Sequence, residues 1–398
     1  MHLAVLTSHP IQYYAPLFRH LAQRLDLHVF YAHDATRAQQ AAAGFGSAFQ
    51  WDIDLTSGYA HSFLNNVSKN PSATQFSGCD TPEIAARLRE GRFDAVLTLG
   101  WHLKSLLQGV WAAKRLKLPV LVRGDSQLGT PRGPAKRWAK ALAYPALLRI
   151  FDAALYVGAH NRSYYLHYGY PEARLFRSPH CVDAERFAAG ATLEAREALR
   201  AGLGVGPATR LVLFAGKLVA FKRPIDVVDA VAGLRARGIG AHAMIAGAGD
   251  FEAAARARAE ERGVPLHVLG FQNQSQMPAA YAGADALVLP STGGETWGLV
   301  CNEALACGTP IIVSEAVGCA PDLAADGWVG RTFPLGNAAA CADALANLFA
   351  DPPSRTEIAA VSARFSITAA ADGILTALAA VTRDRRARTE DVVAGTSN

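Results

Sequence analysis

The sequence predicts an α/β protein with two doubly wound parallel-sheet domains that face each other across a cleft. The chain has 398 residues, and at about 150 residues per domain this length indicates two large domains. Short apolar runs alternate with helix-like stretches in two series of similar size. The runs are almost continuously apolar, as is typical of parallel strands that are covered on both faces.

The composition excludes several classes of protein. Hydrophobic residues make up 51% of the chain and charged residues 18%, which argues against disorder, and the 35 glycines and 20 prolines are scattered. The most apolar stretch, residues 141–157, is interrupted by Arg149 and Asp152, so we expect no membrane span. No secretory signal is recognisable, and the six cysteines include no Cys-x-x-Cys pair. We therefore expect a reduced, cytoplasmic chain.

The expected strands follow one another in two series. A helix over Tyr14–Leu25 belongs to an initial βαβ unit, and residues 35–80 have the composition of loops with at most one short hairpin. The first series contains Leu3–Thr7, Leu27–Tyr31, Ala95–Leu99, Pro119–Val122 and Ala153–Val157. The second contains Arg210–Ala215, Ala241–Ala246, Leu266–Leu269, Ala286–Leu289 and Pro310–Val313, with helices at Pro224–Arg237, Phe251–Arg262 and Asn302–Cys307.

These series place one domain at residues 1–187 and the second at 188–365. A helical segment is expected at 366–386, because its apolar residues recur near helical spacing. The last residues, 387–398, have the composition of a flexible polar tail.

Two carboxylates stand out in the second series. Glu295 lies in a glycine-rich loop after an expected strand, and Glu303 lies in the first turn of the next helix. Backbone N–H groups at such a helix start suit a phosphate. A carboxylate beside that phosphate needs a different partner, and the hydroxyl groups of a sugar or ribose are suitable donors.

Two further loops of the second series carry phosphate-binding features. Lys217 and Lys222 follow Gly216 at the end of a strand and precede a helix opened by Pro224, which suits a diphosphate clamp. Gly247 and Gly249 end the next strand, although a tight turn explains this pair equally well.

Together these blocks resemble the carboxy-terminal domain of retaining GT-B glycosyltransferases, specifically glycosyltransferase family four. The resemblance covers residues 205–335 and includes the Glu-x7-Glu signature of Glu295 and Glu303 and the Gly308-Thr-Pro-Ile-Ile-Val-Ser314 segment. Lys217 stands where the family usually has arginine, and lysine keeps the charge but loses bidentate geometry. The family also implies that the helical segment at 366–386 crosses back to the amino-terminal domain.

The resemblance implies roles for the donor side. Glu303 should accept hydrogen bonds from the ribose, Glu295 should hold hydroxyl groups of the donor sugar, and Phe271 should border the base. Thr296 and the amides of Trp297, Gly298 and Leu299 should face the sugar or the diphosphate. The departing diphosphate would be stabilised by fixed cations and helix amides, so neither a metal nor another cofactor is expected.

The amino-terminal half departs from the family after its first strand, where Ser8 and His9 replace the usual double glycine. These two side chains could supply donors to the site, and His9 is a candidate catalytic residue. After the strand at 119–122, Asp125 is a second candidate beside Glu295, because several family members place a histidine there. The remaining candidates on the acceptor or sugar side are His102, Arg123 and Ser126.

The function expected from this resemblance is sugar transfer with retention of configuration, by front-face attack assisted by the leaving phosphate. The donor is a nucleotide-diphosphate sugar, with UDP favoured, and the acceptor is a glycan, a lipid-linked molecule or a small molecule. Two alternatives are a GT-B-like UDP-sugar epimerase and a non-catalytic sugar-nucleotide-binding subunit.

A basic region in the first series suggests a further partner. Between Lys104 and Arg149, ten basic residues accompany one acid, Asp125. A short helix over Gly133–Leu142, limited by Pro145, would present Trp138 and lysines to an anionic membrane surface. A solvated basic face gives the same counts, and nucleic-acid binding is disfavoured because no recognised module is present. A peripheral position on the inner face of the membrane is therefore one expectation.

Overall fold

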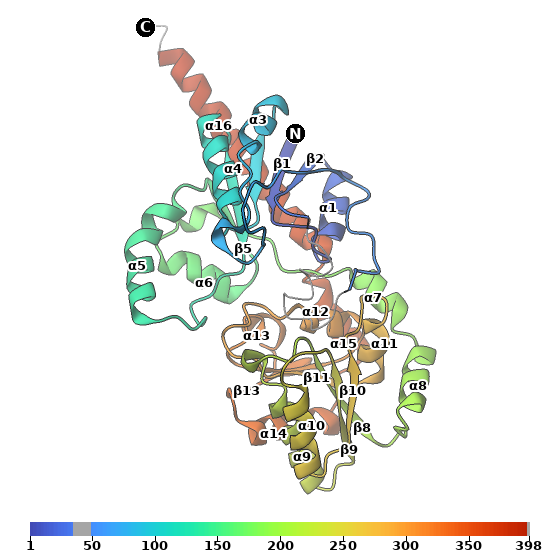
Figure 1. Ribbon diagram of the computed structural model, residues 1–398. Helices are drawn as coiled ribbons and strands as arrows, with labels where there is room; N and C mark the ends of the chain where they lie inside the picture. The colour runs from blue at the N-terminus through green and yellow to red at the C-terminus, as the bar shows by residue number, and fades with distance from the viewer. Residues whose placement is uncertain (35–48, 396–398) are drawn as a thin grey trace.

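The computed structural model describes residues 1–34 and 49–395 and confirms the α/β fold with two parallel sheets (Figure 1). The first sheet has the order β3-β2-β1-β4-β5-β6-β7, and every pairing in it is parallel. Its strands are β1 His2–Thr7, β2 Asp26–Tyr31, β3 Ala60–Phe63, β4 Ala95–Thr98, β5 Val120–Gly124, β6 Ala153–Tyr156 and β7 Leu175–Arg177.

Helices cover both faces of the first sheet. One face packs against α3 Ile84–Glu90, α4 Lys104–Arg115, α5 Pro134–Leu148 and α6 Ala159–His167. The other face packs against α1 Ala15–Ala22 and α16 Ile367–Gly395. This double coverage explains why the central strands are apolar on both sides and fully buried.

The second sheet has the order β10-β9-β8-β11-β12-β13 and is also parallel throughout. Its strands are β8 Arg210–Ala215, β9 Ala241–Ala246, β10 Leu266–Gly270, β11 Ala286–Leu289, β12 Ile311–Ser314 and β13 Gly330–Phe333. One face carries α9 Ile225–Ala236, α10 Glu252–Glu261 and α14 Ala338–Ala350. The other carries α7 Ala184–Gly190, α8 Leu193–Gly202, α11 Met277–Gly283, α12 Leu299–Ala306, α13 Ala320–Leu323 and α15 Arg355–Ala363.

Both sheets reverse their strand order at one point. In the first sheet the reversal lies between β1 and β4, and in the second it lies between β8 and β11. In open α/β sheets, ligands bind beyond the carboxyl ends of the strands at this switch point. The loops that follow β1, β4, β8 and β11 are therefore the places where a site is expected, and they carry most of the polar candidates from the sequence.

The sequence analysis did not predict three of the strands, and all three lie at sheet edges. β3 and β7 form the two edges of the first sheet, and β13 forms one edge of the second. Each has only three or four residues with mixed polarity, so none gives a continuous apolar run. β3 pairs with β2 in parallel, so the hairpin considered for residues 35–80 is wrong for its described part, and residues 35–48 lie outside the described residues.

Two expected boundaries also differ. The limit between residues 187 and 188 falls inside α7, whose Phe187 is buried in the core of the carboxy-terminal half. The expected flexible tail is wrong for residues 387–395, because α16 continues to Gly395. Alanine, arginine and glutamate in this stretch favour helix, and propagating an existing helix adds one hydrogen bond per residue.

The segment Arg355–Arg383 is long and apolar enough, by length and composition alone, to cross a membrane. The structure divides this segment into α15 and α16. The buried residues Ile358 and Val361 of α15 pack in the core of the carboxy-terminal half, whereas Ile374 and Leu378 of α16 pack in that of the amino-terminal half. The apolar residues of this segment are thus buried in the cores of the two halves, and the segment connects these cores.

Helix α16 crosses the first sheet in close contact. It packs against α1, β6 and β7, in the upper part of Figure 1. At the crossing, a Cβ on Gly373 would lie 1.8 Å from the carbonyl oxygen of Arg177, so only glycine allows this approach. The Ser178 hydroxyl donates to the Ala370 carbonyl at 2.9 Å.

We predict that the α16 contact stabilises the amino-terminal half. Ile374 is 1% exposed, and Ile374→Ala should lower the free energy of unfolding by about 2–5 kcal/mol, because it removes buried methyl groups and leaves a cavity. Thr376 lies on the exposed side of the same helix, and Thr376→Ala is the matched control. Urea unfolding that gave equal stabilities for the two variants would contradict the buried contact.

Candidate active site

A cavity of about 490 Å³ lies at the switch point of the second sheet and is lined by both halves of the chain. From the carboxy-terminal half, it is lined by the sequence candidates Gly216, Lys217, Lys222, Gly247, Phe271 and Glu303. The amino-terminal half contributes Gln12, Tyr13 and Trp51. The cavity therefore gathers most of the expected donor-binding residues, and residues from the loop after β1 lie opposite them.

Glycines bring the loops after β8 and β9 together at this cavity. Gly247 has a φ of 156°, and a Cβ there would lie 1.9 Å from the carbonyl oxygen of Gly216. Gly249, with a φ of 149°, approaches the carbonyl oxygen of Leu218 in the same way. Gly249 therefore allows two backbone segments to pack closely but does not line the cavity. Gly247 allows the same kind of packing and also lines the cavity.

Two lysines stand at one end of the cavity. The Lys222 Nζ lies 2.5 Å from Oε2 of Glu295, and both side chains are largely buried. Burial lowers the pKa of Lys217, and the charge of Lys222 lowers it further. Two cations that share one nearby carboxylate give this end a positive potential, which suits a ligand with more than one negative charge.

Glu303 supplies a buried acceptor elsewhere in the cavity wall. It is 2% exposed, and its Oε2 accepts a hydrogen bond of 2.6 Å from the Tyr281 hydroxyl. Its Oε1 is buried and has no hydrogen-bond partner among the described residues, although the Tyr13 and Gln274 side chains lie close enough to the carboxylate to lower its pKa. Burial raises the pKa of this carboxyl group. A buried acceptor without a partner is costly, so this oxygen is suited to a ligand hydroxyl.

Asp125 and Thr296 meet where the two halves touch. The Thr296 hydroxyl donates to Oδ2 of Asp125 at 2.7 Å, across the interface between the halves. Asp125 is half exposed, and His180 Nε2 lies 4.0 Å from the same carboxylate oxygen. The structure thus brings Asp125 and Thr296 together, and Glu295 is the next residue along that loop.

Arg123 does not have the role that we expected. Its side chain is 1% exposed and donates to the carbonyl oxygens of Ser178 and Pro179 at 3.2 and 2.8 Å. It also reaches the Ser178 hydroxyl and the Tyr14 hydroxyl. The guanidinium donors are therefore directed to the chain that connects the halves and not to the acceptor or sugar side, where Arg123 was expected.

Ser8, His9 and His102 form a separate group at the switch point of the first sheet. The Ser8 hydroxyl lies 2.9 Å from Nδ1 of His9. Burial, with smaller contributions from the nearby His33 and His102, lowers the pKa of His9 to about 4. Burial also lowers the pKa of His102. At neutral pH these rings are uncharged, so each can accept a hydrogen bond as well as donate one.

The remaining candidates have mainly structural contacts. The Trp297 side chain is 3% exposed and donates to Asn302 at 2.8 Å, and the Ser126 carbonyl accepts from Asn161. Gly298, with a φ of 101°, precedes α12, which begins at Leu299. The first N–H groups of α12 thus start beside the cavity, since Val300 lines it.

Sequence reasoning missed four residues that the structure brings to this region: Tyr13, Trp51, Gln127 and Tyr281. Tyr13 is buried near Glu303, and burial followed by the Glu303 charge raises its pKa. The pair Tyr13-Tyr14 directly after the loop of Ser8 and His9 was a usable signal, because aromatic residues at a strand's carboxyl end point to a ligand. Trp51, Gln127 and Tyr281 carry no comparable local signal.

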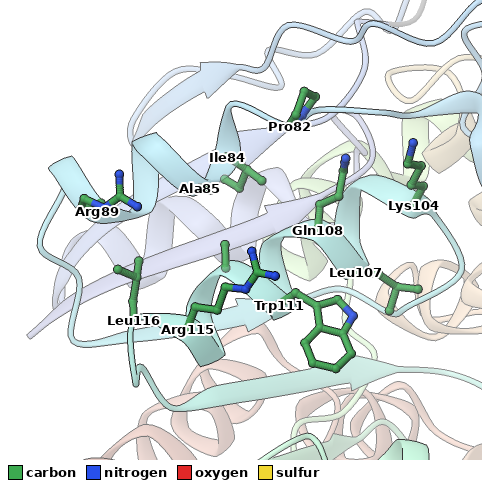
Figure 2. A pocket seen from close by; sticks show the side chains of 11 residues that line it. Pro82, Ile84, Ala85, Arg89, Lys104, Leu107, Gln108, Trp111, Arg115 and Leu116 are labelled. Atoms are coloured by element: carbon green, nitrogen blue, oxygen red, sulfur yellow. The ribbon is translucent and has the colours of Figure 1, made fainter.

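A second hollow lies on the outside of the amino-terminal half. It has a volume of about 550 Å³ and is formed between α3 and α4 (Figure 2). Figure 2 shows Trp111 and Arg115 on α4, and Arg89 on α3 on the other side of the view. None of the sequence candidates lines it, so we assign the candidate active site to the cavity at the switch point.

Comparisons with known proteins find a family model, relatives and solved structures that this chain resembles. Residues 195–365 match the family model of glycosyl transferases group 1. The chain is 35% identical over 201 residues to a D-inositol 3-phosphate glycosyltransferase of Mycolicibacterium gilvum, covering 48% of this chain and 44% of that protein. It is 29% identical over 286 residues to a GDP-mannose-dependent alpha-(1-6)-phosphatidylinositol monomannoside mannosyltransferase of Mycolicibacterium smegmatis, covering 68% and 72%. The match to the first relative thus spans less than half of its length.

The solved structures extend the likeness to the whole fold. Anabaena HepE in complex with UDP and glucose superposes with a TM-score of 0.70 at 17% identity, over 95% of this chain and 99% of that one. The trehalose 6-phosphate synthase of Burkholderia multivorans gives a TM-score of 0.70 at 14% identity, over 98% of each chain. Residues 195–365 thus match the glycosyl transferases group 1 model, and the whole chain has the two-domain GT-B fold of these solved structures.

Proposed function

We propose that this protein transfers a sugar, with retention of configuration, from a nucleotide-diphosphate sugar to an acceptor bound by the amino-terminal half. The observation that carries the proposal is the unpartnered, buried Oε1 of Glu303 in a cavity that also holds Lys217 and Lys222. A ribose hydroxyl would satisfy the carboxylate, and a diphosphate would neutralise the lysines. A nucleoside diphosphate carries both groups.

The chemistry proposed for the site follows from these charges. Lys217 and Lys222 stabilise the negative charge that develops on the leaving diphosphate, as fixed cations in a largely dehydrated site. Glu295 positions hydroxyl groups of the donor sugar, and the leaving phosphate oxygen assists proton removal from the acceptor. Correct positioning of the reactants can lower a barrier by about 7–11 kcal/mol. We propose that no metal takes part, and undiminished turnover in EDTA is the expected result.

The nucleotide and the acceptor are the open parts of this proposal. HepE is described with UDP, and the mannosyltransferase is named for GDP-mannose, so both nucleotides belong in the first binding panel. We retain UDP as the proposed nucleotide. The two relatives are named for inositol-containing acceptors, so inositol phosphates and phosphatidylinositol lipids are the first acceptors to test. Release of free UDP with product formation would separate transfer from epimerisation of the sugar.

Three substitutions should separate the parts of the donor site. Lys222→Ala and Glu303→Ala should weaken UDP binding in calorimetry about tenfold or more, because each removes a charged partner. Glu295→Ala should not weaken UDP binding, because its carboxylate pairs with Lys222 and does not bind the diphosphate. The same variant should reduce turnover of the UDP-sugar about 100-fold, because the contact with the sugar is lost. Full turnover in Glu295→Ala would exclude its positioning role, and unchanged UDP affinity in Glu303→Ala would exclude the ribose contact.

The neutral state of His9 predicts a pH dependence of stability. Its pKa is about 4 in the folded chain and near 6.5 when unfolded, so only the unfolded state binds the proton between these values. Stability should therefore fall as the pH decreases from 6.5 towards 4, and His9 should contribute about 3 kcal/mol to this loss.

The variant His9→Asn should lose this part of the pH dependence in urea unfolding. His167 is exposed, and His167→Asn is the control. A pH profile of His9→Asn that coincides with the parent protein would contradict the buried, neutral state of His9.

We also propose that the amino-terminal half contacts an anionic membrane surface through α5. Trp138 and Leu142 are 71% and 64% exposed, so they are not core residues. The helix continues through Pro145 to Leu148, beyond the expected short helix. Lys140, in contrast, donates to the Tyr164 hydroxyl at 2.8 Å and lies over the Tyr144 ring, so it is not a free membrane ligand.

Sedimentation with vesicles tests this surface. We expect binding to phosphatidylglycerol vesicles at low salt, no binding to phosphatidylcholine vesicles, and weaker binding at high salt. Lys136→Gln with Arg137→Gln should reduce it severalfold. The control is Arg256→Gln with Arg262→Gln, which removes the same charge from the carboxy-terminal half. No binding to anionic vesicles at low salt would exclude the membrane contact.

A further inference from the structure

The loop after β5 and the loop after β11 lie against each other across the interface between the two halves. Gln127 of the first loop is 1% exposed. Its Nε2 donates to the carbonyl oxygens of Gly293 and Glu295, at 3.0 and 2.9 Å. Both carbonyls belong to the loop that carries the Glu295 side chain, so a residue of the amino-terminal half holds the backbone of Glu295.

The orientation of the Gln127 amide is fixed from its own side of the interface. Its Oε1 lies 3.1 Å from Nδ1 of His160, which is in α6. Because Oε1 can only accept, His160 is the donor in this hydrogen bond. The Nε2 donors and the Oε1 acceptor of the amide are thus all hydrogen-bonded. A flipped amide would place its oxygen against two carbonyl oxygens.

Neighbouring contacts hold the same two loops in register. A Cβ on Gly293 would lie 2.2 Å from the carbonyl oxygen of Gly129, so this approach requires glycine. Thr296 donates to Asp125 on one side of Gln127. Asp322 of the carboxy-terminal half accepts a hydrogen bond of 2.9 Å from the Ala159 amide at the start of α6. The loop from Gly293 to Thr296 is thus bound to the amino-terminal half by hydrogen bonds at Gly293, Glu295 and Thr296, and Asp322 adds a contact outside this loop.

The Glu295 side chain, by comparison, is held within its own half. It contacts Lys222 and, at 3.4 Å, the Ser291 hydroxyl. The backbone of Glu295 therefore depends on the amino-terminal half, and its carboxylate faces the donor side. Separation of the halves would release this backbone, whereas the Glu303 carboxylate would keep its hydrogen bond from Tyr281 of its own half.

We infer that Gln127 is a positioning residue, which sets the Glu295 carboxylate for the donor sugar only when the two halves are in contact. This inference rests on the proposed function, in which Glu295 holds hydroxyl groups of the donor sugar. The amino-terminal half would then have two roles, which are to bind the acceptor and to position a residue that holds the donor sugar. Binding of the nucleotide alone does not require Gln127, whereas turnover of the sugar does.

Two substitutions at this position test the inference. Gln127→Met keeps the size of the side chain and removes all hydrogen bonds, and Gln127→Glu keeps its shape but removes the two donors when ionised. The control is Asn66→Leu, because the Asn66 amide also binds backbone groups, at Gly78, Asp80 and Ser68, but within the amino-terminal half. The measurements are melting temperature, UDP affinity by calorimetry, and consumption of UDP-glucose and GDP-mannose.

We expect both Gln127 variants to keep the UDP affinity of the parent within twofold and to lose about 10–100-fold in kcat, because a displacement near 1 Å can cost that much. Asn66→Leu should keep its kcat even where its melting temperature falls. A full kcat in Gln127→Met would overturn the inference. A parallel loss of UDP affinity and turnover would also overturn it, since that result indicates general destabilisation.

Amide hydrogen exchange separates this inference from the proposed function. In Gln127→Met, exchange should increase at residues 292–298 and not around Glu303. If the parent protein consumes neither donor, the proposed function fails, and exchange alone then decides the positioning role. Unchanged exchange at residues 292–298 would overturn that role, whether or not the parent is active.

Discussion

The arrangement of the two halves depends on the buried guanidinium of Arg123. Removing a cation from water costs several kcal/mol unless all of its donors find acceptors, and here the acceptors are backbone carbonyls at Ser178 and Pro179. Ser178 and Pro179 follow β7 directly, so these two bonds hold the chain where it leaves the first sheet. Ser178 in turn bonds to Ala370 of α16. One buried charge therefore fixes the connection between the halves and the crossing of the last helix.

The charges in the cleft are arranged around that fixed connection. Lys217 and Lys222 lie at the carboxyl side of β8, and Glu295 follows β11, so the switch point of the second sheet brings opposite charges together. Glu303 is kept apart from them on α12, in contact with Tyr281. The cavity wall thus holds two cations and a buried acceptor, which are the groups that a diphosphate and a ribose would need under the proposed function.

The sequence predicted the fold class and the central strands, because fully buried parallel strands leave continuous apolar runs. It could not predict β3, β7 and β13, because short edge strands carry no such run. For the site, local motifs were sufficient for Lys222, Glu295 and Glu303, each close to a strand end or helix start. Arg123 was misjudged because a motif does not reveal which acceptors a long side chain reaches. Gln127 was missed because its partners lie more than 160 residues away.

The contacts between the halves also bear on how the donor binds. Tyr13 and Trp51 of the amino-terminal half line the same cavity as Lys217 and Glu303, so a bound nucleotide would touch both halves at once. A ligand that contacts both halves favours the arrangement in which they meet. The hydrogen bonds at Asp125, Gln127 and Asp322 already hold the halves together without a ligand. Part of the ordering that catalysis requires is therefore built into the interface itself, and the donor needs to supply only the remainder.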